Sequence, residues 1–251
     1  MSDNPCDVDL AAVGVLFGDP ARTAMLVALS DGRALPAGEL ARRASVSPAT
    51  ATTHLRRLVE GGLVQVTVQG RHRYHQLAGP QVSAVLEALA HIAPVSPVKS
   101  LRQRRDVTTL AEARTCYDHL AGRRGVELRD RLLAAGALRT IDDRDHNLTA
   151  HGETLITELD IDLDELRSGR RIFARSCLDW TQRRPHLAGA LPAAVNSTFL
   201  ARGWLERSAG RGLRVTPGYD QKLDRWLTAT CRRQPSSADA TPKPAAASTQ
   251  A

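Results

Sequence analysis

The sequence lacks the features that mark several common classes of protein. Its first ten residues, MSDNPCDVDL, contain neither the basic start nor the apolar segment of a secretory signal, and no apolar run is long enough to cross a bilayer. Its four cysteines are widely scattered along the chain. We therefore expect reduced thiols, a cytoplasmic location and no membrane insertion.

Motifs of the major enzyme classes are also missing. The chain has no phosphate-binding P-loop, no glycine-rich dinucleotide turn, no nucleophile elbow and no metalloprotease helix. Acidic clusters at 142–145 and 160–165 lack the spacing and the glycine of a calcium loop, so we interpret them as a solvated turn and a helix cap. We predict that the protein is not an enzyme and has no catalytic residues.

Lysine is scarce, although the chain is basic. Only three of the 34 basic residues are lysines, and the net charge is +7 with a pI near 9.8. Such a surface favours a polyanionic partner, although codon bias also enriches arginine. A hydrophobic fraction of 42% over 251 residues is enough to build two modest domains.

The stretch from Leu35 to Gly79 predicts a helix, a turn, a second helix and a β-hairpin. Apolar residues at helical spacing indicate the first helix, over residues 37–44. Ser47 followed by Pro48 is typical of the start of a helix, and the glycine pair at 61–62 is typical of its end. This order of elements is that of a winged-helix DNA-binding module.

The second of these helices is the one predicted to enter the major groove of DNA. Ala51, Leu55 and Leu58 face inward at helical spacing and leave hydroxyl and basic residues outside. Strand-like runs at 63–68 and 73–77, joined by a basic turn, predict a wing that lies along the DNA backbone or the minor groove. The predicted DNA-contacting residues are Ser47, Ala49, Thr50, Thr52, Thr53, His54, Arg56, Arg57, Arg71, His72 and Arg73.

These residues carry a family resemblance. The segments Val46-SPATATTHLRRLVEGGLV and Gly70-RHRYHQLAG resemble the ArsR-type (arsenic-repressor) winged helix-turn-helix regulators of bacteria, across about residues 8–93. The resemblance implies a homodimer that reads a palindromic DNA operator, and repression that an effector relieves. It also implies that a first helix, expected over Leu10–Phe17, and the helix after the wing, expected over Pro80–Ile92, form the dimer interface.

The metal sites usual in this family are not expected here. The first helix of the motif begins Pro36-Ala-Gly-Glu-Leu without cysteine, and the helix at 80–92 has a single histidine, His91, and no aspartate. The residues that sense the effector must therefore be sought elsewhere in the chain. Val82, Val85, Leu86 and Leu89 form a stripe on this last helix that fits either a dimer interface or an ordinary core.

The second half of the chain contains a duplication. Ala113-Arg-Thr-Cys-Tyr-Asp matches Ala174-Arg-Ser-Cys-Leu-Asp, and each is followed by His-Leu-Ala-Gly. From His119 and His186 onward the offset between the copies stays at 67 residues, after a six-residue insertion at 180–185. We expect two structural copies, each a degenerate winged-helix unit that reads helix, helix, short hairpin, helix.

The fold predicted from these patterns is mainly α, with small β-hairpin wings. We expect a disordered start (1–7), a winged helix-turn-helix domain (8–98), and a duplicated effector domain (99–230) with repeats at about 107–160 and 168–228. A disordered tail follows (231–251). The first repeat has an acidic second turn, whereas the second repeat carries Arg207, Arg211 and Arg214 there, which we interpret as a solvated wing in preference to a DNA contact.

The cysteines and histidines of the duplication allow several interpretations. Cys116 and His119, expected to share one helix face, could join the equivalent Cys177 and His186 in a tetrahedral site for Zn²⁺ or a softer metal. Against this, Trp180 holds the matching place in the second copy and the insertion is expected to displace His186, so we favour buried structural thiols and no metal. A thiol sensor remains open. A small organic effector between Tyr117, Phe173, Trp180 and Trp204 also remains open.

The function predicted from the sequence is that of a dimeric, sequence-specific DNA-binding transcriptional regulator. We expect a repressor that is released by an effector, with Cys116, His119, Cys177, Trp180 and His186 as the candidate sensor residues. The alternative is a winged-helix module that binds protein without binding DNA. The expected partners are double-stranded DNA, a second copy of the chain, and a small-molecule, thiol-reactive or metal effector.

Overall fold

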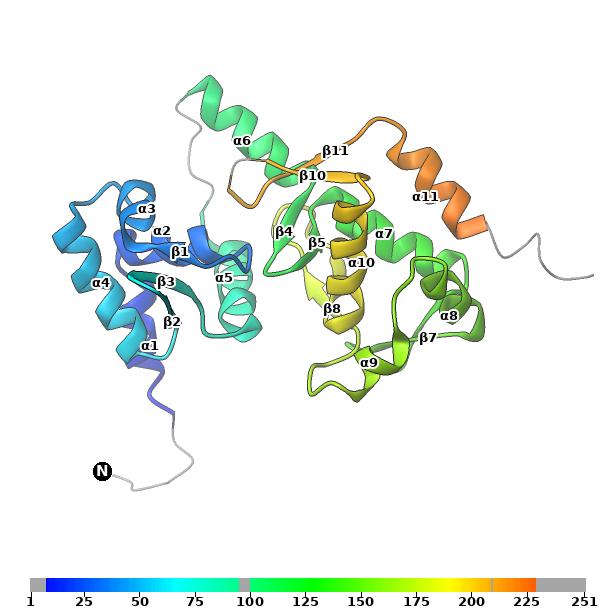
Figure 1. Ribbon diagram of the computed structural model, residues 1–251, viewed down its shortest axis with the longest axis horizontal. Helices are drawn as coiled ribbons and strands as arrows, with labels where there is room; N and C mark the ends of the chain where they lie inside the picture. The colour runs from blue at the N-terminus through cyan, green and yellow to red at the C-terminus, as the bar shows by residue number, and fades with distance from the viewer. Residues whose placement is uncertain (1–7, 95–99, 209, 229–251) are drawn as a thin grey trace, which may run out of the picture.

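The elements form two groups, each around its own hydrophobic core (Figure 1). The computed structural model describes residues 8–94, 100–208 and 210–228, without the side chains of 101–103. One core is built from residues between Met25 and Leu86, and the other from residues between Ala113 and Leu227. The segments predicted to be disordered, 1–7 and 231–251, lie outside the described residues. So do residues 95–98 of Pro94-Val-Ser-Pro-Val, the proline-punctuated stretch at which the predicted boundary between the two domains falls.

The first group is a winged helix-turn-helix with a three-stranded sheet. Its elements are α1 (Leu10–Phe17), α2 (Pro20–Leu29), β1 (Leu35–Pro36), α3 (Ala37–Arg43), α4 (Pro48–Glu60), β2 (Val64–Gln69), β3 (His72–Leu77) and α5 (Pro80–Ile92). The sheet order is β1-β3-β2, so the predicted two-stranded wing gains an edge strand. Pro36, which cannot donate to a ladder, is tolerated because β1 is at the edge.

Local signals set the ends of α4 and the turn of the wing as the sequence predicts. Ser47 Oγ accepts a hydrogen bond from the Thr50 N–H at 3.1 Å, and Gly61 caps the other end of the helix. Gly70 has a φ of 59° in the two-residue turn that joins β2 to β3, with Gln69 opposite His72. A glycine at the first turn position suits a tight hairpin, because it adopts positive φ without steric cost.

The second group repeats one order of elements. After α6 (Leu101–Glu112), a hairpin, a helix, a second hairpin and a second helix follow twice. The first run is β4 (Arg114–Cys116), β5 (His119–Ala121), α7 (Arg123–Ala134), β6 (Leu138–Thr140), β7 (His146–Leu148) and α8 (Ala150–Thr157). After α9 (Leu163–Ser168), the second is β8 (Arg175–Leu178), β9 (Pro185–Ala188), α10 (Ala190–Ala201), β10 (Leu205–Arg207), β11 (Leu213–Val215) and α11 (Tyr219–Thr228).

Each run begins with a hairpin, and the prediction that Cys116 and His119 lie on one helix is wrong. Residues 114–116 and 119–121 are all buried, so the strands show no alternation of buried and exposed positions. Without that alternation, the sequence spacing of Leu110, Ala113, Tyr117 and Leu120 matches a helical period. The helix in fact ends at Glu112. Cys116 and His119 therefore face each other across a hairpin and do not share a helix face.

The core of the second group draws on both runs. Phe199 of α10 packs against Trp204 and Tyr219, with ring centroids 4.6 Å and 6.2 Å apart. The indole N–H of Trp226 donates to the Leu155 carbonyl oxygen at 2.8 Å, which ties α11 to α8. No single helix of the described residues is long and apolar enough to span a membrane, and only α1 and α2 together, bent by 87°, reach that length and composition.

Candidate functional site

The outer face of α4 is exposed and polar. Ala51, Leu55 and Leu58 are buried against the first core, as predicted. Thr52 Oγ1 donates to the Pro48 carbonyl oxygen at 2.9 Å and Thr53 Oγ1 to the Ala49 carbonyl oxygen at 3.3 Å, so the hydroxyl lone pairs stay free for outside contacts. The predicted DNA-contacting residues that are exposed are Ser47, Ala49, Thr50, Thr52, Thr53, Arg56, Arg57, Arg71, His72 and Arg73.

His54 is the member of the predicted DNA-contacting set that does not point outward. Its Nδ1 lies 3.7 Å from Asp19 Oδ1 and 3.5 Å from Arg22 Nη1. Arg22 is buried and also donates to the Val15 and Leu16 carbonyl oxygens, at 2.7 Å and 3.0 Å. His54 therefore helps to fasten α4 to the start of α2, because its position in the helix adjoins the inward stripe.

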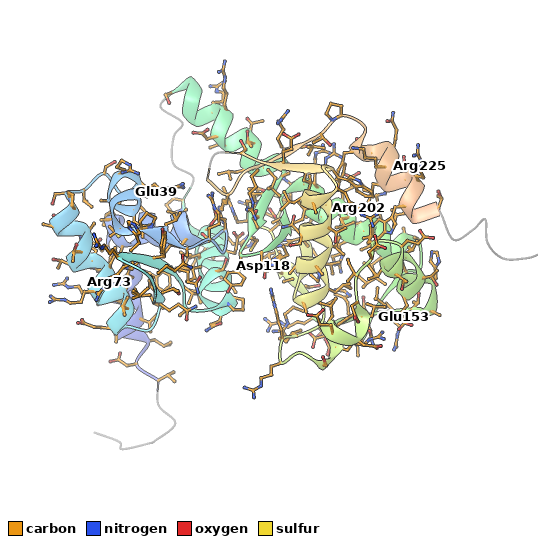
Figure 2. All side chains as sticks on the ribbon, viewed as in Figure 1. Glu39, Arg73, Asp118, Glu153, Arg202 and Arg225 are labelled. Atoms are coloured by element: carbon orange, nitrogen blue, oxygen red, sulfur yellow. The ribbon has the colours of Figure 1, made fainter. Side chains whose placement is uncertain are left out.

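The wing adds exposed arginines beside α4. Arg71 and Arg73 are exposed and, within the described part of the chain, have no acidic partner. Arg57 is likewise without one, whereas Arg56 lies 3.8 Å from Glu60 in an exposed pair. Figure 2 shows Arg73 on the first group, on the side away from the second group. This surface, formed by α4 and the β2–β3 turn, is called the basic face below.

Four predicted sensor residues meet between two hairpins of the second group. Cys116 is opposite His119 across β4–β5, and Cys177 is opposite His186 across β8–β9. One ligand atom from each of the four lies within 4.8 Å of all the others. This group is called the Cys–His cluster below. Three of its members are buried, and Cys177 is half-buried.

The six-residue insertion does not displace His186, contrary to our expectation. The insertion forms a longer loop between β8 and β9, and the hairpin closes again so that His186 pairs with Cys177 as His119 pairs with Cys116. Trp180 lies in that loop and is not part of the cluster. Its ring packs against the Arg114 guanidinium, whose carbon is 5.2 Å from the ring centroid.

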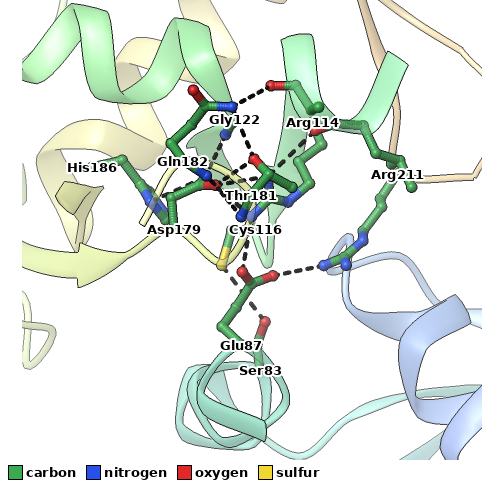
Figure 3. Close-up of polar contacts among 12 residues, drawn as sticks. Ser83, Glu87, Arg114, Cys116, Gly122, Asp179, Thr181, Gln182, His186 and Arg211 are labelled. Carbon is green, nitrogen blue, oxygen red and sulfur yellow. Dashed lines mark hydrogen bonds and ion pairs between the residues drawn. The ribbon is translucent and has the colours of Figure 1, made fainter. Parts of the chain in front are cut away.

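A buried ion-pair network adjoins the cluster (Figure 3). Asp179, from the loop after β8, lies 3.6 Å from His186 Nδ1 and 3.0 Å from Arg114 Nη2. It also accepts hydrogen bonds from the Gly122 N–H at 2.6 Å and the Thr181 hydroxyl at 2.6 Å. Burial alone would raise the pKa of Asp179, but Arg114 and these donors lower it to about 2.

Burial and neighbouring groups together set the protonation of the cluster: burial lowers the pKa of His119, but Cys116 and Asp118 raise it to about 9. A hydrogen bond with Cys177, together with burial, raises the pKa of the Cys116 thiol well above its usual value. Burial lowers the pKa of His186, so this imidazole is neutral. A protonated thiol is a poor nucleophile, so Cys116 in this state reacts slowly with electrophiles.

The network reaches α5 of the first group. Glu87 of α5 is buried and accepts from Arg114 Nη2 at 2.8 Å and from Arg211 Nη1 at 2.7 Å. Ser83, one turn earlier, has its Oγ 3.9 Å from Cys116 Sγ. Arg211 is thus neither a DNA contact nor a solvated wing residue, which corrects our interpretation, because Glu87 draws it into the contact between the two groups.

A cleft of about 830 Å³ opens beside the cluster. Its walls come from one face of α5, including Ser83, Glu87 and His91, and from the β8 region, and Cys116 and Cys177 line it. Of the four aromatic residues expected to enclose an effector, only Tyr117 lines this cleft. Phe173 and Trp204 pack against the second core instead, so that prediction is wrong.

Sequence reasoning missed Glu87, Arg114 and Asp179. Arg114 and Asp179 lie in the duplicated segments 113–118 and 174–179. Each has an identical counterpart 61 residues away, at Arg175 and Asp118. A charged pair repeated in both copies was therefore visible as a signal. Glu87 was visible only as an acidic residue four positions after Ser83 on a largely apolar helix.

Comparison with known proteins gives matches to both halves of the chain. Residues 17–67 match the family described as a helix-turn-helix domain. Over 209 residues the chain is 42% identical to the uncharacterized HTH-type transcriptional regulator YdfF of Bacillus subtilis (strain 168), which covers 83% of this chain and 92% of that protein.

Two solved structures are similar to the first group. The cadmium metal-sensor CMTR from Mycobacterium tuberculosis is 32% identical, with a TM-score of 0.30, and the match covers 36% of this chain and 94% of that one. The second structure is the homodimeric winged helix-turn-helix domain of Mb0332 from Mycobacterium bovis, a possible ArsR-family regulator. It is 25% identical, with a TM-score of 0.32, and the match covers 36% of this chain and 83% of that one.

Proposed function

This chain belongs to the ArsR-type winged helix-turn-helix transcriptional regulators, and from that premise we propose that it is a homodimeric repressor released by an effector bound in its second half. The observation that carries the proposal is the position of α5. This helix packs on the first core through Val82 and Leu86, and its buried Glu87 pairs with two arginines of the second group. A conformational change in the second group would therefore act on α5, which packs against the DNA-binding half.

The basic face supports DNA binding. Arginines at Arg57, Arg71 and Arg73 are free to contact phosphates, which position a protein on the duplex. Thr50, Thr52 and Thr53 lie on the exposed side of α4, where short side chains let the helix backbone approach base edges. With chromosomal DNA as the proposed partner, the proposed site of action is the cytoplasm.

Exposed apolar residues support a homodimer. On α1, Leu10 and Val15 are 75% and 68% exposed, and on α5, Val85, Leu89 and Ile92 are 42%, 40% and 77% exposed. Apolar side chains gathered on the exposed side of a helix are unfavourable in water and are typical of interaction sites. These are the two helices that the family resemblance implies for the dimer interface, and a pair of protomers would present two α4 helices to a palindromic operator.

The test is binding of the purified full chain to the DNA that flanks its own gene. We expect specific binding in fluorescence anisotropy, with an affinity that falls steeply as salt concentration rises, because phosphate contacts release counterions. The protein should also run as a dimer in analytical ultracentrifugation. If the protein bound no flanking fragment in preference to unrelated DNA, and instead captured a protein partner through α4, the alternative of an interaction module would replace this proposal.

A further inference from the structure

The geometry of the Cys–His cluster is that of an assembled ligand set. Each of two hairpins supplies one cysteine and one histidine at directly opposed strand positions. The two histidine rings stack with their centroids 5.2 Å apart, which brings the hairpins together at this point. Two thiols and two imidazoles at mutual distances up to 4.8 Å form the donor set of a tetrahedral zinc site.

Three of the four imidazole nitrogens in this cluster have no hydrogen-bond partner. Nε2 of His119 and both ring nitrogens of His186 are buried without one, although His119 is only 4% exposed and His186 is 0% exposed. A buried polar atom left unsatisfied costs about 1–3 kcal/mol. A bound cation would take the lone pair of one nitrogen on each ring.

A carboxylate lies next to each of the two histidines of the cluster. Asp118 Oδ1 is 3.4 Å from His119 Nδ1, and Asp179 Oδ2 is 3.6 Å from His186 Nδ1. The two aspartates hold equivalent places in the duplicated words. Metal-binding histidines usually direct their second nitrogen to a carboxylate, which fixes the ring and leaves Nε2 for the metal. Arg171 pairs with Asp118 and Arg114 pairs with Asp179, so each carboxylate is itself held in place.

The donor types select the class of ion. Thiolate and imidazole ligands favour Zn²⁺ and softer ions, whereas Mg²⁺ and Ca²⁺ require oxygen ligands. Two thiols that release their protons on binding balance the charge of a divalent ion, so a buried site becomes neutral overall. Cys177 is half-buried on the cleft, which gives an ion a route to the site.

We propose that Cys116, His119, Cys177 and His186 bind one Zn²⁺ ion, or a softer divalent ion of similar coordination, as the effector of the proposed repressor. Tetrahedral ligands around zinc lie about 3.4–3.8 Å apart, so binding draws the two hairpins together. Arg114, two residues before Cys116 on β4, then moves relative to Glu87 of α5. The binding site is independent of DNA binding, and only its role as an effector rests on the function proposed above.

The test is a titration of the reduced full chain with Co²⁺, followed by displacement with Zn²⁺. A background with Cys6→Ser and Cys231→Ser leaves Cys116 and Cys177 as the only thiols, and a thiol count before titration shows that both are reduced. We expect the visible spectrum of tetrahedral, thiolate-bound Co²⁺, saturating at one ion per chain. Zn²⁺ should then abolish that spectrum at one equivalent.

Matched variants assign the ligands. Cys177→Ser and His186→Gln should lose stoichiometric uptake, whereas His91→Gln, a histidine of the same cleft outside the cluster, should bind as the unaltered chain does. Asp118→Asn should retain the spectrum with an affinity about 10–100-fold lower, as expected for a positioning residue. Circular dichroism shows whether each variant is folded, and the half-buried Cys177 keeps the test usable where a Cys116 variant fails to fold.

Three results would overturn the proposal. The first is that the reduced, folded chain takes up no Co²⁺ at one equivalent. The second is the spectrum of an octahedral ion without thiolate, and the third is binding by Cys177→Ser and His186→Gln that is as tight as that of the unaltered chain. None of these results bears on DNA binding, which is measured separately in the presence of chelator. A failure of the site therefore remains distinct from a failure of the repressor function.

Discussion

Glu87 and Arg114 form a fully buried ion pair across the two groups of the molecule, with Oε2 and Nη2 2.8 Å apart. Glu87 belongs to α5 of the winged helix, and Arg114 belongs to the strand that carries Cys116. The same guanidinium also contacts Asp179, the carboxylate beside His186. One arginine thus connects the Cys–His cluster to the DNA-binding half.

Removing Glu87 should destabilise the protein strongly. Glu87→Ala leaves the buried Arg114 and the half-buried Arg211 with one fewer counter-charge, and we expect a loss of about 3 kcal/mol in the free energy of unfolding. All three tryptophans lie in the second half, so tryptophan fluorescence in urea reports this change there. The control is Glu39→Ala, which breaks an exposed pair with Arg43 on α3 and should cost at most about 0.5 kcal/mol. Equal effects of the two variants would contradict a structural role for the buried pair.

Loss of two arginines from α4 should weaken DNA binding without changing the fold. Arg56→Ala with Arg57→Ala removes positive charges that neutralise phosphates, so affinity should fall, and the slope of log affinity against log salt should decrease by about one for each phosphate that is no longer neutralised. Anisotropy titrations at several salt concentrations measure both quantities. Arg207→Ala, an exposed arginine on the β10–β11 hairpin, is the control and should bind normally. Unchanged binding by the double variant would refute the assignment of α4 to the groove.

Charges on the outer face of α5 should dissociate the proposed dimer. Val85→Glu with Leu89→Glu places two carboxylates in the apolar contact, which should shift the sedimentation profile to monomer and reduce operator affinity. Ile141→Glu, at an exposed apolar residue of the β6–β7 turn, should leave the assembly intact. A double variant that still sediments as a dimer would place the interface elsewhere.

Adding a methyl group at Gly125 should disturb the Cys–His cluster by shifting β5, the strand that carries His119. A Cβ at this position of α7 would lie 2.4 Å from the Leu120 carbonyl oxygen and 3.4 Å from His186 Cβ, so β5 must move. We expect Gly125→Ala to lower thermal stability and to weaken Co²⁺ uptake. Gly38→Ala on α3, where nothing lies within 4 Å, should instead stabilise the chain by about 0.5–1 kcal/mol. The two melting temperatures, compared directly, check this prediction.

The winged helix was predictable because its signals are local. Ser47 and Pro48 start α4, Gly61 ends it, and Gly70 turns the wing, and each acts through hydrogen bonds or φ values set within a few residues. Periodicity placed Ala51, Leu55 and Leu58 inside. His54 departed from its predicted position because Asp19 and Arg22, far away in sequence, attract its ring.

The Cys–His cluster was only partly predictable because it depends on long-range contacts. The duplication paired Cys116 with Cys177 and supplied both histidines, but the first pair of strands, β4 and β5, is buried throughout and resembles a helix in its apolar spacing. The return of His186 into register after an insertion depends on closure of the β8–β9 hairpin, which no local pattern encodes. The pairing of Glu87 with Arg114 depends on how the two groups pack.

The most direct measurement of the central claim is the affinity of the full chain for its operator with and without metal. Coupled sites usually differ by about 5–150-fold in affinity between the two states. We predict that one equivalent of Zn²⁺ weakens operator binding at least about fivefold, and that Cys177→Ser shows no difference between Zn²⁺ and chelator. Identical operator affinities for the metal-bound and metal-free chain, at full occupancy of the Cys–His cluster, would contradict the account.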